Sequence, residues 1–184
     1  GRVLDTLQRL NLRDNTILLF FSDNGGLSTG SSPSSVTSIL PNKAGKAWVY
    51  EGGIRVPLII DAPMLKQKGT TLTEPVVSTD FYPTLLDLAG LPLEPKQHLD
   101  GISLKPLLDR SKNKLKREAL FFHYPHYHHI NSMGPSGAVR MGDYKLVIRY
   151  EDSSTELYNL AKDRGELTNL ASQSSGLVNR MKKK

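Results

Sequence analysis

The chain has 184 residues, a hydrophobic fraction of 38%, a charged fraction of 23% and a formal net charge of +6. These values are ordinary for a globular protein, and no apolar stretch approaches the roughly 20 residues needed to span a bilayer. The absence of cysteine excludes disulfides, thiolate metal sites and a cysteine nucleophile within this segment. The basic runs at 112–117 and 182–184 lack interleaved aromatics, so we predict solvated surface and no nucleic-acid binding.

The first predicted element is an amphipathic helix at the start of the chain. Its apolar residues fall on one helical stripe, made of Val3, Leu4, Leu7 and Leu10. No Ser, Thr, Asp or Asn precedes Arg2 as a helix cap. We therefore expect the chain to begin within a structure, as a fragment of a longer protein.

An apolar run at 17–21 predicts a strand that ends abruptly in polar residues. Continuous hydrophobicity is typical of a strand buried on both faces, which favours a parallel sheet covered by helices. Asp23 and Asn24 follow, and the next two glycines allow a tight turn. Ligands bind beyond the carboxyl ends of such strands, and these oxygen donors suit calcium or magnesium. We predict half of a metal site; the alternative is an ordinary turn at a strand end.

A polar loop rich in Ser, Thr, Gly and Pro follows at 27–43 and is expected to form a wall of the site. A second strand is predicted at 58–60, and a helix at 81–89 between a Ser78-Thr79-Asp80 cap and Gly90. Short alternating runs separated by turn residues then predict an antiparallel meander and a closing helix, at 119–123, 138–141, 144–149, 155–158 and 177–181.

These elements predict an α/β fold in two parts. Residues 1–115 would form a layered sheet domain, in which strands and helices alternate. Residues 116–184 form a small α+β subdomain with an antiparallel sheet.

Five motifs stand in order along the chain: Ser22-Asp23-Asn24-Gly25-Gly26; Gly45-Lys46 with Tyr50-Glu51-Gly52-Gly53-Ile54-Arg55-Val56-Pro57; Thr79-Asp80-Phe81-Tyr82-Pro83-Thr84-Leu85; Asp100-Gly101-Ile102-Ser103-Leu104; and Leu157-Tyr158-Asn159-Leu160. In this order they resemble the formylglycine-dependent (type I) sulfatases of the alkaline phosphatase superfamily, and the similarity runs nearly end to end. The resemblance implies that residues 1–115 are the C-terminal part of an alkaline-phosphatase-like layered sheet domain.

The resemblance also implies a chemistry. Asp23 and Asn24 would bind one Ca²⁺, and Lys46 would be a catalytic lysine that contacts the sulfate and the leaving oxygen. A divalent cation suits this reaction because an anionic nucleophile attacks an anionic ester. The nucleophile would be a hydrated formylglycine, which attacks sulfur, expels an alcohol and then releases sulfate. It would lie in an N-terminal half outside this chain, so we expect the isolated chain to be inactive.

Two further groups of residues, the histidines at 123–129 and the lysine loop, allow more than one functional interpretation. Histidines gather at 123–129 and could suggest zinc, but Pro125 and the flanking aromatics favour a loop crossing the substrate pocket. We predict His126 and His128 as substrate contacts, since imidazoles suit sugar hydroxyls or sulfate. Lys46 could instead be a surface lysine. Glu51 and Arg55 are predicted to form an internal ion pair that shapes the loop.

The sequence therefore predicts the C-terminal part of a sulfatase that acts on a sulfated small molecule or carbohydrate. Its partners would be that substrate and the N-terminal half of the same protein, with no membrane span. By analogy we expect it in the periplasm or outside the cell. Two alternatives remain: a phosphonate or phosphodiester hydrolase of the same superfamily, and a non-catalytic polyanion-binding remnant.

Overall fold

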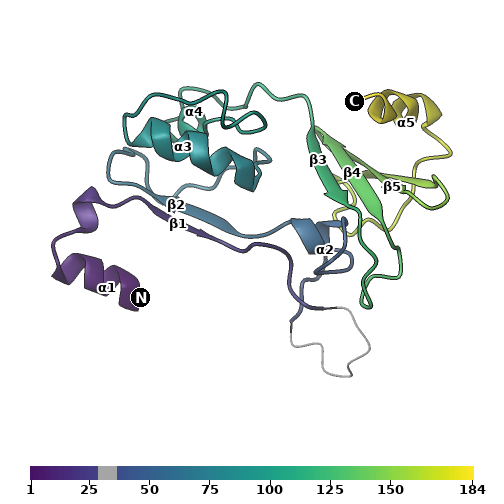
Figure 1. Cartoon of the computed structure of the whole chain (residues 1–184), viewed down its shortest axis with the longest axis horizontal. Coiled ribbons are helices and arrows are strands. Elements are labelled where there is room, and N and C mark those ends of the chain that lie inside the picture. The colour runs from purple at the N-terminus through teal and green to yellow at the C-terminus, as the bar shows by residue number, and fades with distance from the viewer. Residues whose placement is uncertain (29–36) are drawn as a thin grey trace. The chain divides into compact units, whose positions relative to one another are not determined.

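A computed structural model describes residues 1–28 and 37–184 (Figure 1). The chain forms two compact units, one of residues 1–20 and 58–116 and the other of residues 21–57 and 117–184. The domain boundary predicted at 115/116 stays a prediction. The predicted loop wall falls partly on 29–36, outside the described residues. No helix among the described residues is long and apolar enough to cross a membrane.

The first unit holds the N-terminal helices, a two-stranded sheet and the helices that follow it. Its elements are α1 (Arg2–Arg9), η1 (Arg13–Asn15), β1 (Leu18–Phe21), β2 (Leu58–Asp61), η2 (Ser78–Asp80), α3 (Phe81–Leu88) and α4 (Lys105–Leu108). The carboxylate of Asp80 accepts backbone N–H groups from Val77 at 3.0 Å and Ile102 at 2.9 Å. This buried carboxylate therefore fixes the turn that leads into α3. The predicted helix is confirmed and Asp80 is its N-cap residue, but the Asp80 side chain makes no cap hydrogen bond to α3.

Strand β1 is found where it was predicted, but its surroundings differ. It pairs with β2, and the two strands run in opposite directions (Figure 1). Phe20 is 64% exposed and Phe21 43% exposed. The prediction of a parallel strand buried on both faces is therefore wrong for the described chain. The small core of Ala62, Leu65 and Leu88 packs against Ile17 and leaves the aromatic residues of β1 uncovered.

The second unit is built around a four-stranded antiparallel meander in the order β3-β4-β5-β6 (Figure 1). Its elements are α2 (Glu51–Ile54), β3 (Leu120–Tyr124), β4 (Ser136–Met141), β5 (Tyr144–Arg149), β6 (Thr155–Asn159) and α5 (Ser175–Lys182). The register pairs Ala138 with Val147 and Leu146 with Leu157. The predicted meander and closing helix are thus confirmed.

The two faces of the meander bury different partners, because side chains alternate along each strand. One face packs α5 through Leu146, Leu157, Val178 and Met181. The other face packs the segment that precedes α2, through Ala138, Val147, Tyr158, Val49 and Tyr50. The sheet therefore serves as the platform for residues 43–54, which carry the predicted lysine.

Candidate active site

The predicted metal pair lies in a turn directly after β1. The N–H of Asn24 donates to Oδ1 of Asp23 at 3.0 Å, and the hydroxyl of Ser22 donates to the carbonyl oxygen of Asn24 at 2.8 Å. Asp23 is exposed and Asn24 is half-buried. The turn thus presents a carboxylate and a carboxamide, which are the hard oxygen donors that calcium prefers.

Gly25 joins this turn to α2. Its N–H donates to the carbonyl oxygen of Gly53 at 2.9 Å. A Cβ atom at position 25 would lie 1.7 Å from the carbonyl oxygen of Gly52, so only glycine fits this close backbone approach. Gly52 in turn donates its N–H to the carbonyl oxygen of Lys43 at 2.8 Å. The position of the Asp23-Asn24 turn therefore depends on α2.

Lys46 is anchored to the same turn through its backbone. Its N–H donates to the carbonyl oxygen of Gly26 at 3.0 Å, while its side chain is exposed. The flanking loop is tightly curved, since Ala44 and Ala47 have φ angles of +61° and +72°, a region that non-glycine residues rarely adopt. The structure thus brings the backbone of the predicted lysine beside the segment that carries the predicted metal pair.

The connection between β3 and β4 holds this loop from the other side. The carboxamide of Asn131 donates to the carbonyl oxygen of Ala47 at 2.7 Å, and the indole N–H of Trp48 donates to the carbonyl oxygen of Ile130 at 3.2 Å. Asn131 is only 5% exposed. Because the buried Asn131 carboxamide satisfies the carbonyl oxygen of Ala47, it stabilises the positive φ angle of Ala47.

A second anchor is a cage of tyrosines and one carboxylate. The hydroxyls of Tyr50 and Tyr158 both donate to Oε2 of Glu156 at 2.6 Å. The ammonium of Lys43 lies 3.9 Å from the Tyr50 ring centroid, a cation–π distance. Burial and the neighbouring Glu156 raise the pKa of both tyrosines, so their hydroxyls remain protonated donors. The start of the lysine loop is therefore fixed on β6.

The predicted ion pair between Arg55 and Glu51 is confirmed at 3.3 Å. The structure adds partners that sequence reasoning missed, because Glu51 also lies 3.1 Å from the buried ammonium of Lys145. The sequence did carry a signal for this contact: Lys145 lies two positions from Val147 on β5, so both side chains are on the same, core-facing side of the strand. Asn131 offered no such signal, because it lies in an irregular connection.

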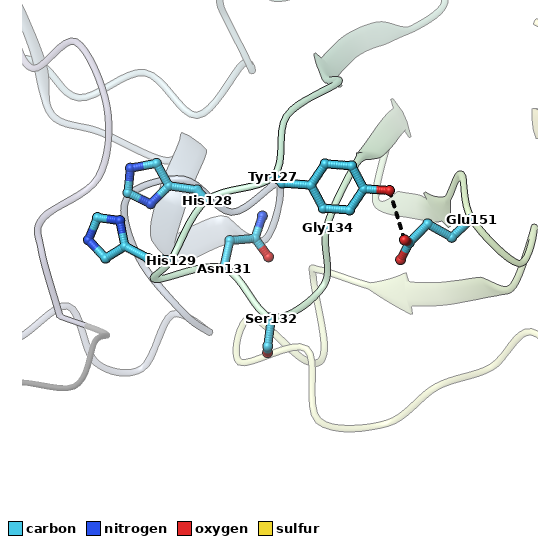
Figure 2. A pocket seen from close by; sticks show the side chains of 7 residues that line it. All are labelled: Tyr127, His128, His129, Asn131, Ser132, Gly134 and Glu151. Atoms are coloured by element: carbon cyan, nitrogen blue, oxygen red, sulfur yellow. Dashed lines mark hydrogen bonds between the residues drawn. The ribbon is translucent and has the colours of Figure 1, made fainter.

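The predicted histidines lie in the β3–β4 connection, and one of them lines a cavity of about 300 Å³ (Figure 2). The rings of His128 and His129 stack at 4.3 Å between centroids. The hydroxyl of Tyr127 donates to Glu151 at 2.9 Å. The lining residues are Tyr127, His128, His129, Asn131, Ser132, Gly134 and Glu151. His126 is not among them and instead contacts Tyr124 edge-to-face at 5.5 Å.

Within residues 1–28 and 37–184, no three His, Asp or Glu side chains converge as metal ligands. The Asp23-Asn24 pair can supply two oxygen donors of the roughly six to eight that calcium takes. Both are oxygen donors of the type that calcium binds.

Residues 44–184 match the family described as "N-sulphoglucosamine sulphohydrolase, C-terminal", and the chain belongs to this sulfatase family. It is 38% identical over 94% of its length to a sulfatase from Formosa agariphila, covering 33% of that protein. It is 31% identical over 92% of its length to an N-acetylglucosamine-6-O-sulfatase from Bacteroides thetaiotaomicron, covering 29% of it. The chain thus spans about a third of the length of these curated relatives.

Solved structures agree with this assignment. Ps i-CgsB, determined in complex with a neocarrahexaose, matches 98% of this chain and 38% of its own chain at a TM-score of 0.80 and 31% identity. A second structure, determined in complex with its substrate D-glucosamine-2-N,6-O-disulfate, matches all of this chain and 36% of its own at a TM-score of 0.76 and 27% identity. The alkaline-phosphatase-like C-terminal fold expected from the resemblance is confirmed.

Proposed function

We propose that this chain is the C-terminal part of a sulfatase that hydrolyses sulfate esters of carbohydrates. The observation that carries the proposal is the hydrogen bond from the Lys46 N–H to the Gly26 carbonyl at 3.0 Å. It supports a shared site, because it joins the backbone of Lys46 to the segment that carries the oxygen donors Asp23 and Asn24. Family membership supplies the reaction class.

In this proposal Asp23 and Asn24 would hold calcium, whose positive charge would offset that of the sulfate ester. Lys46 places its ammonium against a sulfate oxygen or the bridging oxygen, where it stabilises the negative charge that develops on the leaving group. Its exposed side chain is free to reach such an anion. The formylglycine nucleophile that the family resemblance implies lies outside this chain.

The substrate class rests on the cavity and on the relatives. Imidazole, phenol and carboxamide groups line the cavity, and these groups suit the hydroxyls of a sugar (Figure 2). One relative is named as an N-acetylglucosamine-6-O-sulfatase, and one similar structure holds a disulfated glucosamine. We propose that His128 contacts the sugar from this cavity and that His126 contacts it from the adjoining turn.

The test is sulfate release by the full-length protein with calcium present, from an aryl sulfate and from O- and N-sulfated glucosamine and sulfated galactan oligosaccharides. We expect turnover of at least one sulfated sugar, and none by the isolated chain of 184 residues. Preferred hydrolysis of a phosphodiester offered in parallel would favour the phosphodiesterase alternative. Binding of a sulfated polysaccharide without hydrolysis would identify a non-catalytic remnant. Export to the periplasm or the outside stays a prediction, which cell fractionation checks.

A further inference from the structure

A cluster of four charged side chains lies under α2, and all of them except Arg55 are buried. The ammonium of Lys145 is 0% exposed and lies 3.1 Å from Oε1 of Glu51 and 2.9 Å from Oε1 of Glu166. The remaining oxygen of Glu166 accepts the backbone N–H of Glu51 at 2.7 Å. The remaining oxygen of Glu51 pairs with Arg55 at 3.3 Å. Two cations thus balance two carboxylates, and the net charge of the cluster is zero.

A buried cluster of this kind is poor evidence for stability. Removing charges from water costs several kcal/mol per ion, and well-packed apolar residues of similar volume are often as stable or more so. Its clearest consequence here is geometric. Lys145 on β5 and Glu166 after β6 both hold Glu51, so they fix the first residue of α2 on the sheet.

Backbone contacts connect Glu51 and the rest of α2 to the Asp23-Asn24 turn and to the lysine loop. The carbonyl oxygen of Gly53 accepts the N–H of Gly25 at 2.9 Å, and the carbonyl oxygen of Gly52 occupies the place that a Cβ atom of residue 25 would need. Gly25 directly follows Asn24, and the carbonyl of the next residue, Gly26, accepts the N–H of Lys46 at 3.0 Å. A shift of α2 would therefore move both the Asp23-Asn24 turn and the lysine loop.

We propose that Lys145 is a positioning residue of the sulfatase site, which acts through Glu51 and α2 to place Asp23, Asn24 and Lys46. This inference rests on the proposed function. Lys145 itself is fully buried and its ammonium pairs with the carboxylates of Glu51 and Glu166, so we assign it no contact with the substrate.

The principal test is the double variant Lys145→Met/Glu166→Gln in the full-length protein. It removes one cation and one anion, so the cluster stays neutral with Glu51 and Arg55. We expect kcat to fall at least tenfold and the calorimetric Kd for Ca²⁺ to rise at least tenfold. Should this variant not fold, Glu166→Gln alone keeps the pair of Lys145 and Glu51, and we expect the same two losses at a smaller scale.

The matched control is Leu146→Ala. Leu146 is the next residue of β5 and is also 0% exposed, but it points to the opposite face, against α5. It should lower Tm at least as much as the double variant, yet leave kcat and the Ca²⁺ Kd within twofold. A double variant that keeps both quantities within twofold, in a protein whose wild type hydrolyses sulfate esters, overturns the inference and leaves the proposed function standing. A wild type without sulfatase turnover overturns both.

Discussion

The carboxamide of Asn131 donates a hydrogen bond to the carbonyl oxygen of Ala47 at 2.7 Å, across 84 positions of sequence. Ala47 has a φ of +72° and directly follows Lys46. A buried side chain of the β3–β4 connection therefore holds the strained residue next to the proposed catalytic lysine. The same connection lines the cavity in Figure 2, so one segment serves both the lysine loop and the proposed sugar contact.

Replacing this amide should impair catalysis through the loop. In Asn131→Asp a carboxylate would face the Ala47 carbonyl, and the lost donor should cost about 1–3 kcal/mol of unfolding free energy. We expect a lower kcat as the turn relaxes away from its strained φ. Steady-state kinetics and denaturant unfolding check this. Asn179→Asp is the matched control, because it makes the same change at an exposed position of α5, and it should leave both values near wild type.

Gly25→Ala tests the close approach between the turn and α2. Because the new Cβ would lie 1.7 Å from the Gly52 carbonyl oxygen, the backbone must move apart. We expect weaker Ca²⁺ binding and a loss of turnover, measured by calorimetry and sulfate release. Gly176→Ala in α5 is the control: its Cβ would meet nothing within 4 Å, and alanine should raise helix stability by about 0.5–1 kcal/mol. An unchanged Ca²⁺ affinity in Gly25→Ala would refute the dependence of the turn on α2.

Lys46→Ala should remove activity and leave stability unchanged, since the side chain is exposed. Loss of one preorganised group that stabilises developing charge lowers kcat about 10²–10³-fold. Lys46→Arg should restore only part of this, because a planar guanidinium does not reproduce a compact ammonium. Lys182→Ala, another exposed lysine in the same unit, provides the comparison. Wild-type kcat in Lys46→Ala would show that this lysine belongs to the ordinary surface.

Acid should weaken the first unit through Asp87. Burial acts to raise the pKa of Asp87, but hydrogen bonds from Ser103 at 2.6 Å and Lys105 at 3.0 Å outweigh it and leave this pKa below its ordinary value. A depressed folded-state pKa contributes stability that is present above the unfolded value, about 3.9, and is lost as pH falls through the folded value.

Asp87→Asn should therefore lower the free energy of unfolding at pH 7, and the difference from wild type should shrink as pH falls below about 4. Calorimetric Tm values of the full-length protein across this range check the sign. Ser103→Ala removes one of the two hydrogen bonds and should show a smaller effect of the same direction. A difference in Tm between Asp87→Asn and wild type that does not vary with pH would show that ionisation of Asp87 does not contribute to stability.

Local periodicity was sufficient to predict most elements. Alternation along β5 sends Leu146 and Val147 to opposite cores, and the meander was predicted for that reason. The apolar run of β1 gave its position but not its environment, because an identical run is compatible with Phe20 buried or exposed. The position of Asp23 and Asn24 followed from where this run ends.

Contacts across long sequence separations could not be predicted from local patterns. Lys145 reaches Glu51 across 94 positions, and only the folded sheet brings them together. Likewise, spacing alone could not show that His128 lines the cavity, as its neighbour His129 does, whereas His126 does not. The role of Lys46 came from a family motif, and the structure adds the backbone contact with Gly26.

The most direct measurement is a crystal structure of the full-length protein with calcium and a bound sulfate. The side-chain oxygens of Asp23 and Asn24 should lie about 2.3–2.6 Å from calcium. The Lys46 ammonium should lie within about 3.2 Å of a sulfate oxygen. Calcium held by other residues, with the Asp23-Asn24 turn away from it and Lys46 directed into solvent, would contradict the proposed site.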